Sequence, residues 1–307
     1  MNALVTGGAG FIGSHVADAL LEKGYHVEIV DNLLTGQREN IPDKAVFHEI
    51  DIRDEKLDEV FKKGNFDVVF HLAAQMDIKN SVLNPAFDAD ANILGGINLL
   101  QAMKRNNVNK ITFSSSCAVY GEQVSFPAAE DHQNFPDSPY GIGKLAFEKY
   151  LYFYHKEFGL NYTALRYANI YGPRQRGDGE GGVVAIFFRQ LFSNKEAYIF
   201  GDGNQTRDLT YVGDVVRANI LSIDSDKCGT FNVSTGKETT INTLYNMIRE
   251  IVGSNQDRLH KPPREGETMR SVLDNSAITK ALNWQPQVDI KTGLKNTADY
   301  FTQKVSV

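Results

Sequence analysis

Residues 6–13, Thr-Gly-Gly-Ala-Gly-Phe-Ile-Gly, lie between an apolar run at 3–6 and an amphipathic segment at 11–23. Their four glycines, at positions 7, 8, 10 and 13, form both a GxGxxG and a GxxGxxG spacing. Glycines at a strand-to-helix turn let the backbone approach a pyrophosphate, and the helix N-terminus presents free N–H groups to it. A glycine-rich turn alone is weak evidence, but a dinucleotide site requires this strand–turn–helix context. We therefore expect a bound dinucleotide to contact Gly7, Gly10, Phe11, Ile12 and Gly13.

Short apolar runs alternate with amphipathic segments through the first half of the chain. We expect strands at 3–6, 26–30, 46–49, 67–72, 110–114 and 161–166. The expected helices between them span 11–23, 56–63, 87–105 and 141–158. This alternation is typical of right-handed βαβ units, so it predicts an α/β fold with a doubly wound parallel sheet. Because glycines interrupt the pattern at 172–182, we expect a dinucleotide-binding domain over 1–170 and a smaller α/β substrate domain over 171–307.

The composition excludes several classes of protein. The chain has 307 residues, of which 42% are hydrophobic and 23% charged, with a formal net charge of −6. These values are ordinary for a folded protein and indicate no general attraction to nucleic acid or acidic membranes. No apolar run approaches the roughly 18 residues of a membrane-spanning helix, and no targeting signal is apparent. The two cysteines and seven histidines form no metal motif, so we expect a cytoplasmic protein without a metal site.

Two acidic residues follow predicted strands near the glycine-rich turn. Asp31 lies 18 residues beyond Gly13, where a carboxylate can accept hydrogen bonds from both adenosine ribose hydroxyls. It would repel a 2′-phosphate, and the residue after it is the uncharged Asn32, so the pattern favours NAD over NADP. Asp51 and Ile52 follow the third predicted strand, and we expect them at the adenine edge.

Tyr140 and Lys144 are four residues apart, so on a helix their side chains share one face. Lowering the pKa of a tyrosine from near 10 to about 7 needs roughly 4 kcal/mol, which an ammonium and a nicotinamide cation nearby can supply. Ser116 ends the fifth predicted strand, and open α/β sheets bind ligands at that end. The three residues therefore predict a site that takes a proton from a substrate hydroxyl, with Ser116 sharing that proton.

Over essentially its whole length, the sequence resembles the extended short-chain dehydrogenase/reductase family. The shared motifs are TGGAGFIGSH (6–15), HLAA (71–74), SSSCAVYG (114–121), YGIGK (140–144), RYANIYGPR (166–174), GDG (201–203), RD (207–208), YVGD (211–214) and LNW (282–284). Within the family, the nearest likeness is to bacterial UDP-glucose 4-epimerases. The resemblance implies a Rossmann domain that binds NAD, a smaller domain for a UDP-sugar, and a homodimer. It also implies that part of 204–235 returns to the Rossmann domain.

The resemblance implies a role for each matching residue. Tyr140 is similar to the general base, Lys144 to the residue that binds the nicotinamide ribose, and Ser116 to the partner of the substrate hydroxyl. Further implied cofactor contacts are Leu72, Ala73, Ala74, Asn92 and Tyr167. Implied substrate contacts are Asn169, Arg207 and Arg264 at the diphosphate, Glu267 near the uridine ribose, and Val183, Val184, Tyr198 and Phe200 at the uracil.

Three positions bear on which reaction of the family is catalysed. Cys117 and Ala118 stand where sugar-nucleotide dehydratases carry Asp and Glu, so elimination lacks its acid and base, and we expect the Cys117 thiol to pack rather than react. The remaining reaction is 4-epimerisation, by transient oxidation at C4, rotation of the 4-keto sugar and return of the hydride. Ser271 stands where a bulky aromatic side chain excludes N-acetylated sugars. We therefore expect turnover of UDP-GlcNAc and UDP-GalNAc as well as UDP-glucose and UDP-galactose.

Two alternatives remain open from the sequence. The stretch Gly-Pro-Arg-Gln-Arg at 172–176 also resembles UDP-glucuronate 4-epimerases, in which an arginine meets the C6 carboxylate. A non-catalytic NAD-binding sensor could use the same fold, since fold alone does not determine function. Such sensors usually lose the tyrosine or the lysine, and this chain keeps both Tyr140 and Lys144.

Overall fold

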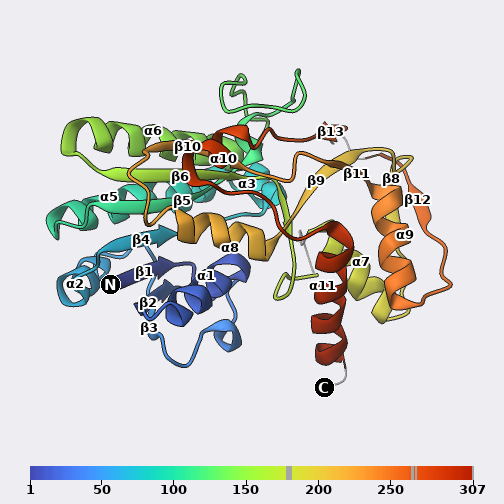
Figure 1. The fold of residues 1–307 in the computed structure, drawn as a ribbon, viewed down its shortest axis with the longest axis horizontal. Helices are drawn as coiled ribbons and strands as arrows, with labels where there is room; N and C mark the ends of the chain where they lie inside the picture. The colour runs from blue at the N-terminus through green and yellow to red at the C-terminus, as the bar shows by residue number, and fades with distance from the viewer. Residues whose placement is uncertain (178–181, 264–265, 267, 306–307) are drawn as a thin grey trace.

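The computed structural model describes residues 1–177, 182–263, 266 and 268–305. Its largest sheet has seven parallel strands (Figure 1), in the order β10-β6-β5-β4-β1-β2-β3. These strands are β1 (Asn2–Thr6), β2 (His26–Asp31), β3 (Val46–Glu49), β4 (Val68–His71), β5 (Lys110–Ser116), β6 (Asn161–Tyr167) and β10 (Gly229–Val233). The order runs outward in both directions from the β1–β4 pair, so the predicted doubly wound α/β fold is confirmed.

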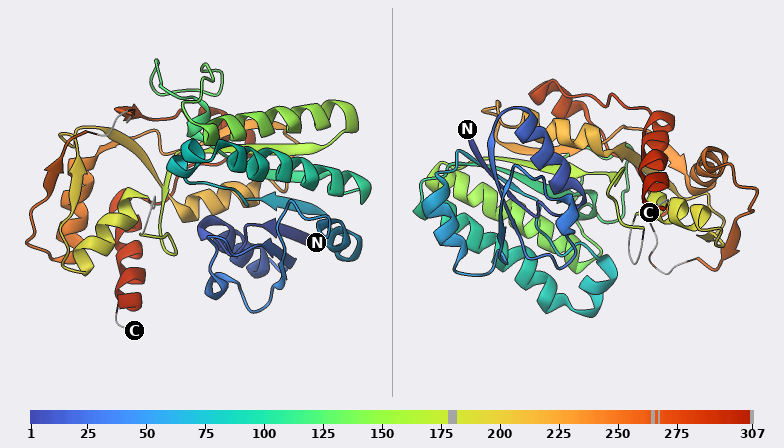
Figure 2. Two further views of the ribbon diagram at one scale, coloured as in Figure 1. Left: turned by 180° about the vertical axis from the view of Figure 1, so that it is seen from behind. Right: turned by 90° about the horizontal axis from the view of Figure 1, so that it is seen from below.

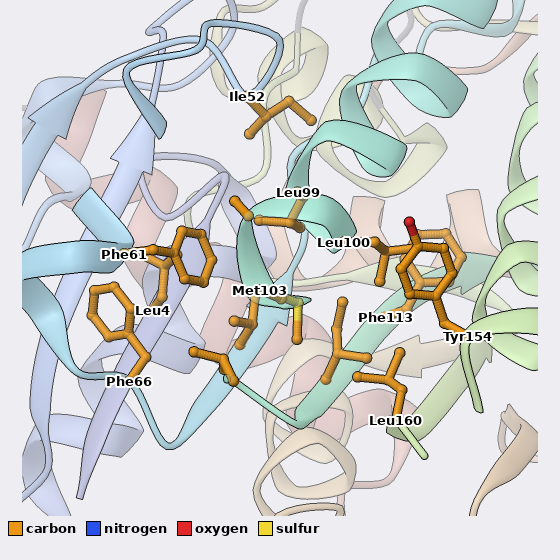
Figure 3. Close-up of a cluster of buried hydrophobic side chains, with 14 of the residues drawn as sticks. Leu4, Ile52, Phe61, Phe66, Leu99, Leu100, Met103, Phe113, Tyr154 and Leu160 are labelled. Carbon is orange, nitrogen blue, oxygen red and sulfur yellow. The ribbon is translucent and has the colours of Figure 1, made fainter. Parts of the chain in front are cut away.

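Helices cover both faces of this sheet, as two views from different sides show (Figure 2). One face carries α1 (Phe11–Glu22), α8 (Val212–Leu221) and α10 (Ser276–Leu282), whose apolar side chains pack on alternate strand residues. The other face carries α2 (Leu57–Gly64), α5 (Gly95–Arg105) and α6 (Pro139–Phe158). Figure 3 shows the core on that second face, where Phe61, Leu99 and Met103 meet Leu4 of β1. The strands are apolar on both sides because both faces are buried.

The segment predicted as one helix over 87–105 contains a change of helical type. It consists of α4 (Pro85–Ala89), a π-helical turn η2 (Asp90–Leu94) and α5. A preceding helix, α3 (Ile78–Leu83), was not predicted. π-turns are rare and often mark functional sites, because the wider turn re-aims the side chains within it. Here that turn contains the buried residue Asn92.

The remaining elements form a second cluster beside the large sheet (Figures 1 and 2). Strand β9 (Thr206–Tyr211) pairs with β7 (Asn169–Tyr171), β11 (Glu238–Thr240) and β13 (Arg270–Ser271), and β8 (Tyr198–Phe200) pairs with β12 (Leu259–Lys261). Helices α7 (Val183–Phe192), α9 (Ile241–Val252) and α11 (Ile290–Val305) pack together through Phe187, Tyr245 and Leu294. Within the described ranges, no helix is long and apolar enough to cross a membrane.

Candidate active site

The glycine-rich turn brings the carboxyl ends of β1 and β4 together. Gly7 has a φ of +72°, and a Cβ there would lie 2.5 Å from the backbone nitrogen of Ala73. A Cβ at Gly13 would clash with the carbonyl oxygen of Gly7. The turn therefore requires glycine at both positions, and it places residues 72–74 beside the start of α1. Because β1 and β4 flank the point where the strand order reverses, this is where open α/β sheets bind ligands.

Asp31, at the end of β2, has a fixed carboxylate beside the turn. Its Oδ2 accepts a hydrogen bond from the backbone N–H of Ala9 at 3.0 Å, and its Oδ1 accepts one from Leu33 at 2.8 Å. Burial raises the pKa of this carboxyl above its usual value. Each oxygen keeps a lone pair for a ribose hydroxyl, so the carboxylate and the glycine cradle together fit a dinucleotide.

Asp51 lies near this end of the site and is held by Arg53, which the sequence reading missed. The guanidinium of Arg53 donates two hydrogen bonds to the carboxylate, at 2.8 and 2.7 Å, and its backbone N–H donates a third at 2.9 Å. Asn32 donates a fourth at 2.7 Å. These contacts hold the pKa of Asp51 well below its usual range. Arg53 also donates to Asp90 of η2 at 2.6 Å, so it joins the segment after β3 to the π-turn. Ile52 is buried and packs in the core beneath.

Ser116, Tyr140 and Lys144 come together at the end of β5 and the start of α6. Ser138 caps this helix by accepting a hydrogen bond from the N–H of Gly141, so Tyr140 lies in the first turn. Burial raises the pKa of the Tyr140 phenol, and the nearby Ser116 hydroxyl opposes this rise. Lys144 is 3% exposed, and its Nζ donates to the carbonyl of Ser114 at 2.7 Å and lies 5.7 Å from the centre of the Tyr140 ring.

Burial drives both titratable groups towards their neutral forms. It raises the pKa of Tyr140 to about 12 and lowers the pKa of Lys144 to about 7. The charges of Asp88 and Glu148 oppose the shift at Lys144. With these groups alone the phenol stays protonated at neutral pH, so a phenolate requires a further positive charge beside Tyr140. An oxidised nicotinamide ring carries such a charge, and the donor set therefore fits this cofactor.

Asn92 and Tyr167, which are also predicted to contact the cofactor, lie near this group. The polar atoms of both side chains form hydrogen bonds within the protein. Asn92 accepts from the N–H of Gln75 and donates to its carbonyl, both at 2.9 Å, so it fixes the segment that follows β4. Tyr167 is buried between β6 and α8, where its hydroxyl and the Asn219 amide are hydrogen-bonded. Sequence reasoning also missed Gln75, Asp88 and Glu148, because their partners come from other segments of the chain.

Most of the predicted substrate residues that the structure describes lie on the second cluster. A pocket of about 710 Å³ there is lined by Phe200, Gly201, Asp202, Gln205, His260, Lys261, Pro263 and Met269. Arg207 donates to the carbonyls of Thr206 and Thr268 at 2.8 and 2.7 Å, and Ser271 lies buried opposite it in the β9–β13 pair. The charge of Arg207 also acts on the Cys117 thiol, and that thiol acts on Tyr140. Electrostatic interactions therefore link Arg207 of the second cluster to the Tyr140 group through Cys117.

The other predicted substrate positions differ in their surroundings. Asn169 begins β7 opposite Leu209 of β9. Tyr198 is covered by the Lys261 ammonium, 3.5 Å from the centre of its ring. Val183 and Val184 begin α7 and pack against the second core cluster. Arg264 and Glu267 lie outside the described residues.

Known proteins share both this sequence and this fold. Residues 3–234 match the NAD dependent epimerase/dehydratase family. The chain is 47% identical to a putative UDP-glucose 4-epimerase from Methanocaldococcus jannaschii, over 97% of each chain. A UDP-glucose 4-epimerase from Thermotoga maritima, solved with UDP-glucose, is 47% identical with a TM-score of 0.98, covering 99% of this chain and 100% of its own. A UDP-N-acetylglucosamine 4-epimerase from Methanobrevibacter ruminantium, solved with UDP-N-acetylmuramic acid, is 38% identical with a TM-score of 0.95, covering 99% and 98%. The chain therefore belongs to the NAD dependent epimerase/dehydratase family.

Proposed function

We propose that this protein is an NAD-dependent UDP-sugar 4-epimerase that interconverts UDP-glucose and UDP-galactose. The observation that carries the proposal is the grouping of Ser116, Tyr140 and Lys144 beside a dinucleotide turn. Positions 117 and 118 carry no carboxylic acid for elimination. The 47% identity to a putative UDP-glucose 4-epimerase supports the same reaction.

The contacts of the three side chains support a role for each. Tyr140, as phenolate, removes the proton of the C4 hydroxyl, and Ser116, whose hydroxyl acts on the pKa of the phenol, shares that proton. Lys144, held in place by the Ser114 carbonyl, binds the nicotinamide ribose and stabilises the phenolate with its charge. Bound NAD⁺ supplies the hydride acceptor for C4 and a second positive charge beside Tyr140. Asp31 and the backbone around Gly7 hold the adenosine ribose and the pyrophosphate.

Inversion at C4 requires a diphosphate that stays in place while the sugar turns. We assign the diphosphate to Arg207 and Asn169, whose strands β9 and β7 pair directly. Two backbone carbonyls fix the guanidinium of Arg207, and a fixed guanidinium forms strong charge-assisted hydrogen bonds with phosphate. The 4-keto sugar turns on this anchor, so that C4 regains its hydride on the opposite face while Tyr140 returns the proton to O4. We assign the uridine to the pocket that Phe200 lines.

Ser271 supports a broad choice of sugar. It lies beside Arg207, the proposed diphosphate ligand, and its hydroxymethyl group occupies far less space than an aromatic ring. We therefore propose that UDP-GlcNAc and UDP-GalNAc are also substrates. The similar enzyme from Methanobrevibacter ruminantium carries N-acetylglucosamine in its name, which supports this extension.

The two alternatives have less support. Arg174, the first arginine of the 172–176 stretch, forms an ion pair with Asp18 of α1 at 2.7 Å. Arg176 donates to the carbonyl of Thr35 at 3.4 Å. Both contacts hold these arginines against the dinucleotide-binding side of the protein, at α1 and at the segment after β2. This placement weakens the UDP-glucuronate alternative. A sensor would have no need for the Ser116–Tyr140–Lys144 group.

A homodimer and a cytoplasmic location belong to the same proposal. Apolar side chains are exposed on η2 and α6, and these two elements pack against each other. The exposed residues are Leu94, Ile142, Tyr150, Tyr152, Phe153 and Phe158. A second copy related by a two-fold axis would cover this surface with the same surface of its own. The proposed ligands, NAD and UDP-sugars, are intracellular nucleotides.

Proton NMR of the purified protein, without added NAD, tests the function. Separate incubations with UDP-galactose, UDP-GalNAc and UDP-glucuronate should convert the first two to their gluco epimers. Conversion of UDP-glucuronate alone would replace the proposal with the alternative. If none reacts even after NAD is added, the epimerase function is wrong.

A further inference from the structure

Asp88, on α4, has a buried carboxylate that the proposed reaction does not yet use. The residue is 1% exposed. Its Oδ2 accepts hydrogen bonds from the side-chain amides of Gln75 and Asn92, at 2.8 and 3.1 Å. Within the described part of the chain, its Oδ1 has no hydrogen-bond partner. A buried carboxylate with one unpartnered oxygen is costly unless an opposite charge compensates it.

The hydrogen bonds of Asp88 connect it to the cofactor side of the site. Asn92 and Gln75 bond to each other as well as to Asp88, and Gln75 directly follows residues 72–74 beside the glycine-rich turn. The three side chains therefore hold the segment after β4 against α4 and the π-turn.

Gly143 brings this group close to Lys144. A Cβ at Gly143 would lie 3.3 Å from the Cβ of Asn92 and 3.4 Å from Asp88 Oδ1. Because Gly143 has no side chain, α4 and η2 pack closely on α6 one residue before Lys144. The unpartnered oxygen of Asp88 thus faces α6 at Gly143, and the charge of Asp88 acts on Lys144, the next residue of this helix.

Four elements contribute the groups that contact Lys144 or act on its charge. These groups are Asp88 of α4, Tyr140 and Glu148 of α6, His71 of β4, and Phe113 and Ser114 of β5. The two carboxylates differ in their partners. Glu148 forms two hydrogen bonds with Arg166, at 2.7 and 3.0 Å, so that guanidinium largely balances its charge. The two donors to Asp88 are neutral amides. Burial lowers the pKa of His71 to about 3, so His71 brings no charge at neutral pH.

We propose that Asp88 is a positioning residue for epimerisation, whose carboxylate is the counter-charge of the Lys144 ammonium and holds the Gln75–Asn92 pair against the cofactor segment. This inference rests on the proposed function for its catalytic consequence. Asp88 acts through Lys144 and Tyr140 rather than on the sugar.

The proposal has a defined effect on pH dependence. Burial lowers the pKa of Lys144 to about 7, and the charge of Asp88 opposes that shift. Without this charge, Lys144 loses its proton at lower pH. Asp88 also raises the pKa of Tyr140, so without it the phenol ionises at lower pH. Both limbs of the profile of kcat/KM against pH should therefore move to lower pH.

The test compares Asp88→Asn with Glu157→Gln, which removes the same charge from an exposed position on α6. The amide oxygen of D88N can still accept the bonds from Gln75 and Asn92, so the variant removes mainly charge. We expect the D88N profile to move by about one pH unit towards acid, with an activity loss of about tenfold near pH 8 that diminishes near pH 6. Asp88→Glu, which keeps the charge, should retain the wild-type profile even if its rate falls.

NADH affinity, measured by the fluorescence of the bound nucleotide, gives a readout without substrate. Its pH midpoint should move in D88N by the same amount as the activity profile. An unmoved profile and midpoint in D88N, or equal shifts in E157Q or D88E, would overturn the proposal. If the wild-type protein turns over no UDP-sugar, the proposed function fails separately, and the NADH midpoint still tests the role of Asp88.

Discussion

Tyr140 must lose a proton and Lys144 must keep one, yet burial acts against both requirements. Burial raises the pKa of the phenol to about 12 and lowers that of the ammonium to about 7. Nearby groups must supply the difference, and Ser116 acts on the phenol while Asp88 and Glu148 act on the ammonium. At the scale of single residues, activity therefore depends on a few charges in a poorly solvated site.

Removal of the phenol hydroxyl tests the proton acceptor. Tyr140→Phe should lower kcat by about 10²–10⁴-fold, the usual contribution of a general base. Its melting temperature should stay close to that of the wild type, because the ring is kept. Tyr152→Phe, at an exposed position on the same helix, is the matched control and should keep full activity. A Y140F variant with the wild-type rate would contradict the assigned base.

The proposed sugar specificity also rests on one residue, Ser271. Ser271→Tyr should abolish turnover of UDP-GalNAc while kcat/KM for UDP-galactose falls much less, because the added ring fills the space for the acetamido group. Steady-state kinetics with both substrates measures the ratio. The same substitution at exposed Ser276 should leave it unchanged. Equal losses for both sugars in S271Y would mean that Ser271 does not select the substrate.

At the scale of elements, the sequence predicts the features that depend only on residues close together in the chain. The glycine-rich turn and the pair Tyr140–Lys144 depend on short spacings, and the strands of the first half have continuous apolar runs. The π-turn at Asp90–Leu94 depends instead on how α4 and α5 pack on α6 at Gly143 and Gly96. Arg53 has its second partner 37 residues away, so no local pattern reveals its role. Periodicity could not show that β10 pairs with β6.

The buried pair Glu148–Arg166 joins α6 to β6, and Ser115 of β5 donates to the same carboxylate at 2.5 Å. Glu148→Gln should lower the free energy of unfolding by about 3–5 kcal/mol, because it leaves a buried guanidinium without its counter-charge. Chemical denaturation measures this change. Glu157→Gln, on the exposed side of α6, should change the free energy by less than about 0.5 kcal/mol. Equal stabilities of the two variants would show that the pair contributes little.

At the scale of the whole molecule, the large sheet with its helices and the second cluster of elements have separate roles in the mechanism that we propose. The seven-stranded sheet presents a rigid surface for the cofactor and the catalytic group, while the β9 strands and their helices hold the nucleotide of the substrate. Arg207 of the second cluster and Tyr140 of the first both interact electrostatically with Cys117. Such a division leaves the sugar free to turn between two fixed ends.

The assembly can be tested by its exposed apolar surface. Leu94→Arg combined with Phe153→Asp should convert the proposed dimer to a monomer, because it places charges where apolar side chains would be buried. Size-exclusion chromatography with light scattering measures the mass. Ile251→Asp on α9, an equally apolar but separate position, should leave the mass unchanged. A wild-type monomer would contradict the proposed homodimer.

The central claim is that C4 loses a hydride to the cofactor and then regains the same hydride within one site. The most direct measurement uses UDP-galactose with deuterium at C4, and follows the label by NMR and mass spectrometry as UDP-glucose forms. Retention of the deuterium at C4 of the product, in ordinary water, is the result that the proposed mechanism predicts. Exchange of that deuterium for solvent protons would contradict it, because it would require removal of C4 hydrogen as a proton.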